Sequence, residues 1–444
     1  MTASQKICFG FFAVITVGTL LLMMPFSTAT GTWNSLIVAL FTATSAVCVT
    51  GLAVADTGTD FSFWGQLTIV LLAQVGGLGY MVFTTFLIML TGRRFDLRHK
   101  MAIQQALDRR EMQGSGNIIR SIIATTLFFE ITGIFLLLIV FVPDFGWNKG
   151  IWLAIFHSIS AWNNAGFSLF SNSLVDYNSS ALLVFTISGL IIFGGIGYQV
   201  ILEMFFGLRD RLRRRPRNIV LSLDYKVAVN TTIFLLILGT LAFFFVEVRN
   251  AETIRYFNFR SQFLAALFQS VTTRTAGFNS IDIGSMTNAG LFITIAFMFI
   301  GASPGGTGGG MKTTTLRVLS SCTKSILQGK QEVLLYERRI AVSLILKAVG
   351  VVVGSVTVVI ICTILISITD PAFEFIQILF EVVSAYATVG LSTGITGEFS
   401  IWGKLILILT MYMGRVGVLL LMSAVLGDPK PTRIHYPEED LLVG

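Results

Sequence analysis

Charged residues are scarce in this sequence. Only 12% of its 444 residues are charged, about half of the roughly 25% that is usual in soluble domains, whereas 54% are hydrophobic and the mean hydropathy is +0.79. This composition excludes an ordinary soluble protein. Long apolar runs lie at residues 7–25, 67–91, 182–206, 227–246 and 405–426, each near the ~20 residues needed to cross a ~30 Å hydrocarbon core. We therefore expect an integral membrane protein with several spans.

Histidine and cysteine are also rare, and neither forms a cluster. The three histidines are His99, His157 and His435, and the four cysteines are Cys8, Cys48, Cys322 and Cys362. Their spacing fits neither a disulfide framework nor a metal site, and the carboxylates are not grouped with a nucleophile or base. We therefore predict that the protein is not an enzyme and holds no cofactor in this chain. The first apolar run has no small-residue cleavage site after it, so we expect it to be a retained helix.

A short segment recurs four times along the chain, and each copy ends in a glycine followed by Leu or Phe. The copies are FTATSAVCVTGL at residues 41–52, FHSISAWNNAGF at 156–167, LFQSVTTRTAGF at 267–278 and FEVVSAYATVGL at 380–391. The intervals from Gly51 to Gly166, from Gly166 to Gly277 and from Gly277 to Gly390 are 115, 111 and 113 residues. Four such intervals nearly fill the sequence, which predicts one structural unit used four times.

Each unit has the same predicted order, namely an apolar helix, the short segment and a second apolar helix. The helical part of the short segment is only about 10–14 residues, too short to span a membrane and typical of a re-entrant helix. We expect an all-α fold of four tandem units, at residues 1–108, 109–222, 223–337 and 338–444. Their second helices are predicted at residues 63–91, 181–206, 289–315 and 401–426.

The basic residues predict the orientation of these units, because Lys and Arg accumulate on cytoplasmic loops. The links between units, at residues 93–110, 209–217 and 312–339, hold eighteen of them, whereas the links within units hold only Lys149, Arg249, Arg255 and Arg260. We expect eight spanning helices, parallel units and both termini in the cytoplasm. The run at residues 209–217 has a composition that nucleic acid would also bind, but a loop facing lipid headgroups is the simpler interpretation, so we expect no nucleic-acid partner.

Four re-entrant segments around one axis would enclose a polar cavity, because non-helical backbone at membrane depth must be buried in protein or face water. If each short helix directs its C-terminal end inward, the partial negative charge of that end favours a cation in the cavity. The backbone carbonyl oxygens that follow can replace the hydration shell of the cation. No carboxylate ring is present, which favours a monovalent cation. Helix packing by small residues is the alternative explanation for a single such glycine. The candidate selectivity-filter residues are Val49, Thr50, Gly51, Asn164, Ala165, Gly166, Thr275, Ala276, Gly277, Thr388, Val389 and Gly390.

These segments, together with GGLGY at residues 76–80 and GGIGY at 194–198, resemble the Trk/Ktr/HKT superfamily of potassium transporters over essentially the whole chain. The sequence is most similar to the potassium-translocating membrane subunit of Ktr systems. TTRTAGF at 272–278 and GASPGGTGGGMKT at 301–313 are the most specific motifs. The resemblance implies potassium uptake across the plasma membrane, with K⁺ bound in the filter and selectivity supported by glycine at position 51. It also implies a homodimer, a cytosolic ring of nucleotide-binding regulatory subunits and stimulation by sodium.

The second helix of the third unit contains the run GASPGGTGGG at residues 301–310. Pro304 removes a helical hydrogen bond and each glycine costs about 1 kcal/mol relative to alanine, so we expect the helix to break there. A phosphate-binding loop is excluded by spacing, because Met311 separates the last glycine from Lys312. The resemblance implies an intramembrane gate loop beneath the filter, formed by Ala302, Ser303, Pro304, Gly305, Gly306, Thr307, Gly308, Gly309 and Gly310.

Arg415 lies deep in the last apolar run, where a charge is costly and is functional by default. The resemblance places it at the pore near the gate loop, where its charge would oppose ion passage; a structural role, bonded to loop carbonyls, is compatible with this. Arg274 is expected to brace the third segment from behind, and Glu130, Glu203 and Glu381 are candidate partners for either arginine. The alternative function is a secondary sodium/potassium transporter with a midplane cation site, which favours inverted repeats over parallel ones.

Overall fold

The computed structural model describes residues 2–79, 115–212 and 221–427. Several sequence predictions lie outside these residues. They are the end of the first GGLGY motif at Tyr80, the basic residues at 93–110 and 213–217, the unit boundary at 108/109, and the C-terminal tail from residue 428.

The described chain is all-α apart from one small hairpin, β1 (Leu334–Leu335) paired with β2 (Arg338–Arg339). Four of its helices are long and apolar enough to span a membrane, or up to six if each bent pair counts as one span. The predicted membrane protein is therefore confirmed at this level, whereas eight separate spans exceed what length and composition alone give for the described residues. The α-helices are α1 (Ala3–Met23), α2 (Leu36–Val47), α3 (Phe63–Leu78), α6 (Ser115–Trp162), α7 (Ala181–Ile196), α8 (Tyr198–Leu212), α9 (Leu223–Glu247), α10 (Phe259–Thr272), α11 (Asn288–Phe299), α12 (Thr313–Leu327), α13 (Val342–Thr369), α14 (Phe375–Tyr386), α15 (Ile401–Val416) and α16 (Val418–Leu426).

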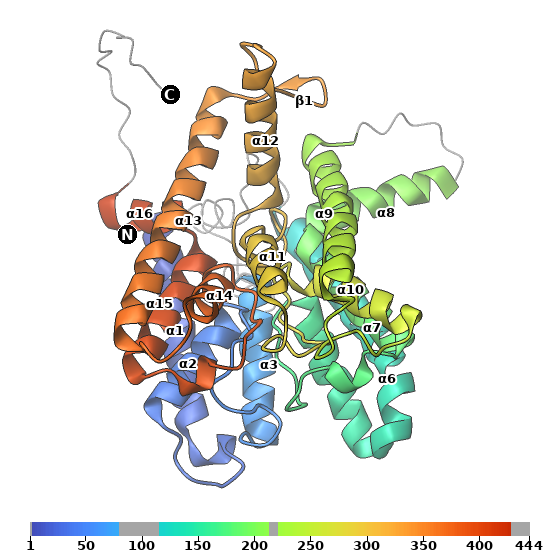
Figure 1. Ribbon diagram of the computed structural model, residues 1–444, viewed down its shortest axis with the longest axis vertical. Coiled ribbons are helices and arrows are strands. Elements are labelled where there is room, and N and C mark those ends of the chain that lie inside the picture. The colour runs from blue at the N-terminus through green and yellow to red at the C-terminus, as the bar shows by residue number, and fades with distance from the viewer. Residues whose placement is uncertain (1, 80–114, 213–220, 428–444) are drawn as a thin grey trace.

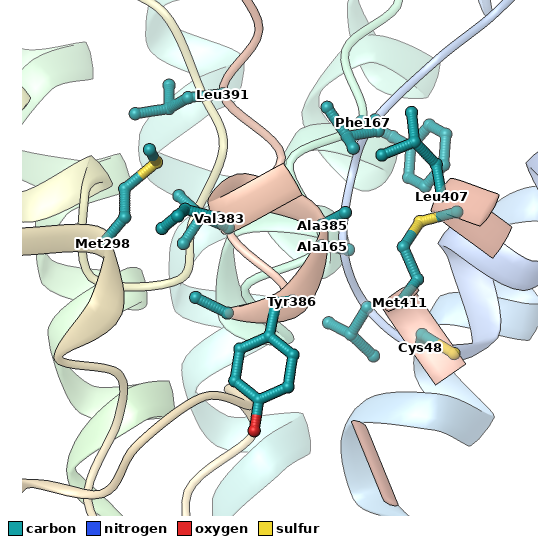
Figure 2. Close-up of a cluster of buried hydrophobic side chains, with 14 of the residues drawn as sticks. Cys48, Ala165, Phe167, Met298, Val383, Ala385, Tyr386, Leu391, Leu407 and Met411 are labelled. Carbon is teal, nitrogen blue, oxygen red and sulfur yellow. The ribbon is translucent and has the colours of Figure 1, made fainter. Parts of the chain in front are cut away.

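Four short helices lead into the glycine-ended segments. Three are α2, α10 and α14, of 12 to 14 residues, and the fourth is residues 147–162 of α6, which follow a sharp turn at Gly146 (φ 74°, ψ 171°) just after Pro143. Their C-terminal parts are buried in the bundle, whereas their first turns carry exposed side chains such as Leu36, Phe259 and Phe375. Part of the surrounding core is drawn in Figure 2, where Cys48, Ala165 and Ala385 come from three different glycine-ended segments but belong to one buried cluster.

The prediction of continuous helices at 181–206 and 401–426 is wrong. Gly197 ends α7 with φ 96° and Gly417 ends α15 with φ 87°, and the chain then turns by 104° into α8 and by 93° into α16. These backbone angles lie far from the helical region and are accessible mainly to glycine, so the helix cannot continue through them. Gly79 ends α3 in the same way, with φ 78° and ψ 130°.

The predicted break at residues 301–310 is confirmed, because α11 ends at Phe299 and α12 begins at Thr313. Beyond the break, α12 and the hairpin at its end project from the body of the bundle, opposite the turns that join α1 to α2 (Figure 1). These projecting elements carry Arg317, Lys324, Arg338 and Arg339.

Candidate functional site

We call residues 49–51, 164–166, 275–277 and 388–390 the four ring segments. Each has two residues in the left-handed backbone region, at the same two positions. The first residue is not glycine, with φ of 58° at Val49, 57° at Asn164, 67° at Thr275 and 51° at Thr388. The third residue is the repeated glycine, with φ between 70° and 93°. Non-glycine residues adopt this region rarely, so its recurrence shows that the surrounding structure imposes one backbone geometry on all four segments.

The four glycines approach one another closely. A Cβ atom added to Gly51 would lie 2.9 Å from the Cα of Gly166, and one added to Gly166 would lie 3.0 Å from the Cα of Gly277. The corresponding distances are 3.2 Å from Gly277 to Gly390 and 3.0 Å from Gly390 back to Gly51. The segments therefore close a ring in chain order, with no space for a side chain on any of the glycines.

Carbonyl oxygens of the ring segments face the neighbouring segments. The same added Cβ atoms would lie 2.5 Å from the carbonyl oxygen of Ala165, 2.9 Å from that of Ala276, 2.5 Å from that of Val389 and 2.0 Å from that of Thr50. All four of these residues are fully buried. Within the described part of the chain, no donor forms a hydrogen bond to these four oxygens. Buried carbonyls normally have a partner, so the ring presents acceptors that are suited to a cation or water.

The amide groups of the same residues point back to the short helices. Thr50, Ala165 and Val389 donate to the carbonyl oxygens of Ser45, Ser160 and Ser384, each at 2.8 Å, and Ala276 donates to that of Thr272 at 3.0 Å. The hydroxyls of Ser45 and Ser384 also accept from the amides of Gly51 and Gly390, each at 3.1 Å. Because these amide N–H groups bond to the short helices, the groups that face the centre of the ring are the carbonyl oxygens.

The loop between α11 and α12 lies against the ring segments. The amide of Gly309 donates to the hydroxyl of Thr388 at 3.0 Å, and a Cβ on Gly308 would lie 2.0 Å from the hydroxyl of Thr275. On its other side the loop is tied to α7, because the amides of Ser303 and Thr307 donate to the carbonyls of Gly195 and Gly194 at 3.0 and 3.1 Å. The loop thus closes one side of the ring.

Hydrogen bonds within the loop and to the start of α12 hold its C-terminal end. The Lys312 ammonium donates to the carbonyl oxygen of Gly308 at 2.7 Å, within the loop itself. The side chain of Ser303 shares a hydrogen bond of 2.8 Å with that of Thr313, where α12 begins. The loop residues Ala302 and Ser303 are fully buried, as expected of backbone inside the bundle.

Arg415 connects this loop to α3. Its guanidinium donates to the carbonyl oxygens of Thr307 and Gly76. The alternative that Arg415 bonds loop carbonyls therefore matches the contacts, and its position beside the loop is the one that the resemblance implied. Arg274 is buried and its Nε has no partner among the described residues; it lies at a small apolar cavity lined by Ile191, Leu236 and Ala302.

None of the three candidate carboxylates bonds to either arginine. Glu203 accepts from the amide of Ser222 at 3.2 Å, and Glu130 accepts from the side chain of Asn163 at 3.4 Å. Glu381 accepts four hydrogen bonds from the chain that follows the fourth ring segment. Sequence reasoning named Glu381 only as a candidate partner of an arginine and missed this contact.

The bundle with its central ring of backbone carbonyls defines a multi-pass membrane protein with a cation-compatible centre. Residues 1–428 match the model of the TrkH family, described as cation transport proteins, and the chain belongs to this family. It is therefore a transporter and not an enzyme, as the sequence predicted.

Relatives of full length support this assignment. The chain is 37% identical over 443 residues to the Ktr system potassium uptake protein B of Bacillus subtilis, covering 100% of this chain and 97% of that protein. It is 38% identical to the protein of the same name from Vibrio alginolyticus, over 99% of this chain and 94% of that one. The Potassium/sodium uptake protein NtpJ of Enterococcus hirae is 36% identical, with 99% and 97% covered.

The fold also has a solved counterpart. The crystal structure of the potassium transporter TrkH from Vibrio parahaemolyticus matches with a TM-score of 0.71 at 18% identity, covering 95% of this chain and 85% of that one. The resemblance to the Trk/Ktr/HKT superfamily inferred from the motifs is confirmed.

Proposed function

We propose that this chain is the membrane subunit of a Ktr-type system and takes up potassium across the plasma membrane. The observation that carries the proposal is the closed ring of four glycines, with the carbonyl oxygens of Thr50, Ala165, Ala276 and Val389 directed at it. Carbonyl oxygens of this kind replace the hydration shell of K⁺. The names of the full-length relatives, which are potassium uptake proteins, support the same cation.

The ring segments act as the selectivity filter in this proposal, and each belongs to one of four parallel units around a pseudo-fourfold axis. Two features support this: the shared backbone geometry of the segments and their closure in chain order. The unit limits at 108/109, 222/223 and 337/338 stay predictions. The basic residues of α12 and the hairpin support a cytoplasmic position for this end of the molecule. The cytoplasmic position of both termini stays a prediction.

The loop at residues 302–310 acts as the gate. It is seated on the ring segments through Thr388 and is held by the guanidinium of Arg415, so it must move before an ion can pass in that direction. Membership of a Ktr system would supply a cytosolic ring of nucleotide-binding regulatory subunits, with the nucleotide on that partner. A homodimer and stimulation by sodium also belong to this proposal.

Uptake by a strain that lacks its own potassium transporters tests the proposal. The full chain should restore growth at low potassium and take up K⁺ in preference to Na⁺. Gly51→Ser should reduce this preference, because a side chain there meets the carbonyl oxygen of Ala165 at 2.5 Å. Equal uptake of the two ions by the unmodified chain would instead support the alternative of a sodium/potassium transporter, which the name of the Enterococcus relative also raises.

A further inference from the structure

The chain that leaves two of the ring segments is held by a buried polar side chain on the preceding short helix. The two side chains are His157 and Glu381, each nine residues before its ring glycine, and both are fully buried. Neither contributes to the ring itself. In each case their partners include the second and third residues after the glycine.

Glu381 uses both carboxylate oxygens. Its Oε1 accepts from the Ser392 hydroxyl at 2.8 Å and from the amide and hydroxyl of Thr393 at 2.8 and 3.1 Å. Its Oε2 accepts from the Thr396 hydroxyl at 2.7 Å. A fully buried carboxylate with four donors is strongly anchored, because removal of the acceptor leaves several buried donors unsatisfied.

His157 makes the equivalent contact in the second segment. Its Nδ1 lies 2.8 Å from the carbonyl oxygen of Leu153, so Nδ1 carries the proton and Nε2 is an acceptor. The Nε2 atom accepts from the Ser168 hydroxyl at 3.0 Å and from the amide of Leu169 at 3.4 Å. The imidazole also stacks on the ring of Phe170, with 5.0 Å between centroids.

The two held segments support the other two. The carbonyl oxygen of Leu169 lies 2.2 Å from a Cβ added to Gly58, and that of Thr393 lies 2.8 Å from one added to Gly284. Gly58 and Gly284 are each seven residues after their own ring glycine, Gly51 and Gly277. The chain after the first ring segment therefore packs on the chain after the second, and the chain after the third packs in the same way on the chain after the fourth.

The equivalent contact was not found for the first and third ring segments among the described residues: the residue nine positions before the ring glycine does not bond to the chain after that glycine. The residues there are Thr42 and Phe268, and among the described residues neither side chain forms a hydrogen bond to the chain after its ring segment. Since the ring closes in chain order, the held segments stand opposite each other. At the outer end of the filter the pattern of contacts thus has twofold symmetry, because two opposite segments are held and two are not, although the ring of glycines itself is fourfold.

We propose that Glu381 and His157 are positioning residues that set ion selectivity by fixing the outer end of the filter, and through it the neighbouring segments. This inference rests on the proposed potassium uptake. Carbonyl oxygens select between cations by the number and arrangement of the dipoles around the ion, so a shifted filter segment changes the selectivity. In enzyme active sites a misplacement of about 1 Å costs on the order of 100-fold in rate, which sets the scale of effect to look for. Neither side chain touches the ion.

The chain offers a matched control in Glu247. This carboxylate is also buried and also accepts four hydrogen bonds, from Asn250, Thr253 and the amide and hydroxyl of Thr287, but it anchors the start of α11 and not a ring segment. Glu381→Ala and Glu247→Ala each remove a buried carboxylate that accepts four hydrogen bonds, the first beside a ring segment and the second away from the ring. Glu381→Gln tests rescue, because its amide oxygen still accepts from Ser392 and Thr393 and its NH₂ donates to the Thr396 hydroxyl.

The experiment measures initial K⁺ and Na⁺ uptake into liposomes that hold the purified full-length chain, normalised to folded protein. Glu381→Ala should lower the K⁺/Na⁺ uptake ratio about tenfold or more, and Glu381→Gln should stay within about threefold of the unmodified ratio. His157→Phe, which keeps the stacked ring but loses the acceptor, should lower the ratio like Glu381→Ala. Glu247→Ala should reduce only the yield of folded protein.

Two results would overturn the inference. One is an unchanged K⁺/Na⁺ uptake ratio in Glu381→Ala and His157→Phe. The other is a Glu381→Gln variant that is as unselective as Glu381→Ala, which would indicate that the negative charge of Glu381, and not its hydrogen bonds, sets the selectivity. If Glu381→Ala does not fold, His157→Phe and Glu381→Gln decide between these outcomes. Absence of K⁺ uptake by the unmodified chain would refute the proposed function instead.

Discussion

Arg415 in α15 donates a hydrogen bond to the carbonyl oxygen of Thr307 and so joins α15 to the loop between α11 and α12. The same guanidinium donates to the carbonyl oxygen of Gly76 in α3. One partly buried side chain therefore links three parts of the chain that are remote in sequence. Arg415 lies two residues before Gly417, where the chain bends by 93° from α15 into α16.

Arg415→Gln should increase potassium flux several-fold in liposomes. The substitution removes a positive charge from beside the proposed ion path and removes a hydrogen bond that holds the loop, and a hydrogen bond from a charged group is worth about 1.5–3 kcal/mol. Arg415→Lys separates the two effects, because lysine keeps the charge but cannot reach both carbonyls with a planar fork. A lysine variant as fast as the glutamine variant identifies the loop contact as decisive. Lys404→Gln on the same helix is the control, and its flux should match that of the unmodified chain.

The four ring glycines should differ in their tolerance of alanine. An added Cβ meets a carbonyl oxygen at 2.0 Å at Gly390, at 2.5 Å at Gly51 and Gly277, and at 2.9 Å at Gly166. The loss of the K⁺/Na⁺ uptake ratio should follow this order, with Gly390→Ala the most severe, because backbone carbonyls cannot move aside without leaving the ring.

Gly31→Ala provides the control for backbone strain alone. Its φ of 70° equals that of Gly166, but nothing lies within 4 Å of an added Cβ. This variant should keep the uptake ratio of the unmodified chain. A ratio that falls equally at Gly31 and at the ring glycines would contradict the assignment of the ring as the filter.

Repeat analysis was sufficient to place the ring segments, because each glycine follows a short apolar helix at nearly constant intervals and backbone closure needs glycine at the same place each time. The break after Phe299 was also predictable, since the run of glycines around Pro304 cannot form a stable helix. These features depend on local backbone chemistry, which a single sequence displays.

The bends at Gly197 and Gly417 were not predicted, because an isolated glycine is common in membrane helices and its φ depends on what packs around it. The contacts of Glu381 were not predicted, and those of Arg415 only in part, because a bond to loop carbonyls was one interpretation of Arg415 but its contact with α3 was not foreseen. Their partners lie on other segments, at Thr393 and at Thr307 and Gly76, and only the closed bundle determines which carbonyls and hydroxyls meet a long side chain. For such residues the sequence indicates that a buried charge needs partners but does not identify them.

The two bend glycines allow strain to be separated from contact. Both Gly197 and Gly417 have positive φ, but an added Cβ at Gly417 meets nothing within 4 Å whereas one at Gly197 lies 2.6 Å from the carbonyl oxygen of Pro304. Gly417→Ala should cost about 1–3 kcal/mol of stability through strain alone, and Gly197→Ala should cost more. The apparent melting temperature in detergent should therefore fall in that order. Gly189→Ala, at a helical glycine with open space around it, should not lower this temperature.

Thr388→Val tests how the loop is seated on the ring. The Thr388 hydroxyl accepts from the amide of Gly309 at 3.0 Å, and valine has nearly the same shape without the acceptor, so a buried N–H is left unsatisfied at a cost of about 1–3 kcal/mol. This cost destabilises the closed position of the loop, and potassium flux should rise while the protein remains folded. Thr363→Val in α13 is the matched control, because the Thr363 hydroxyl is buried and has no partner among the described residues. Flux that is unchanged in Thr388→Val, or raised equally in Thr363→Val, would show that the contact between Thr388 and Gly309 does not hold the loop closed.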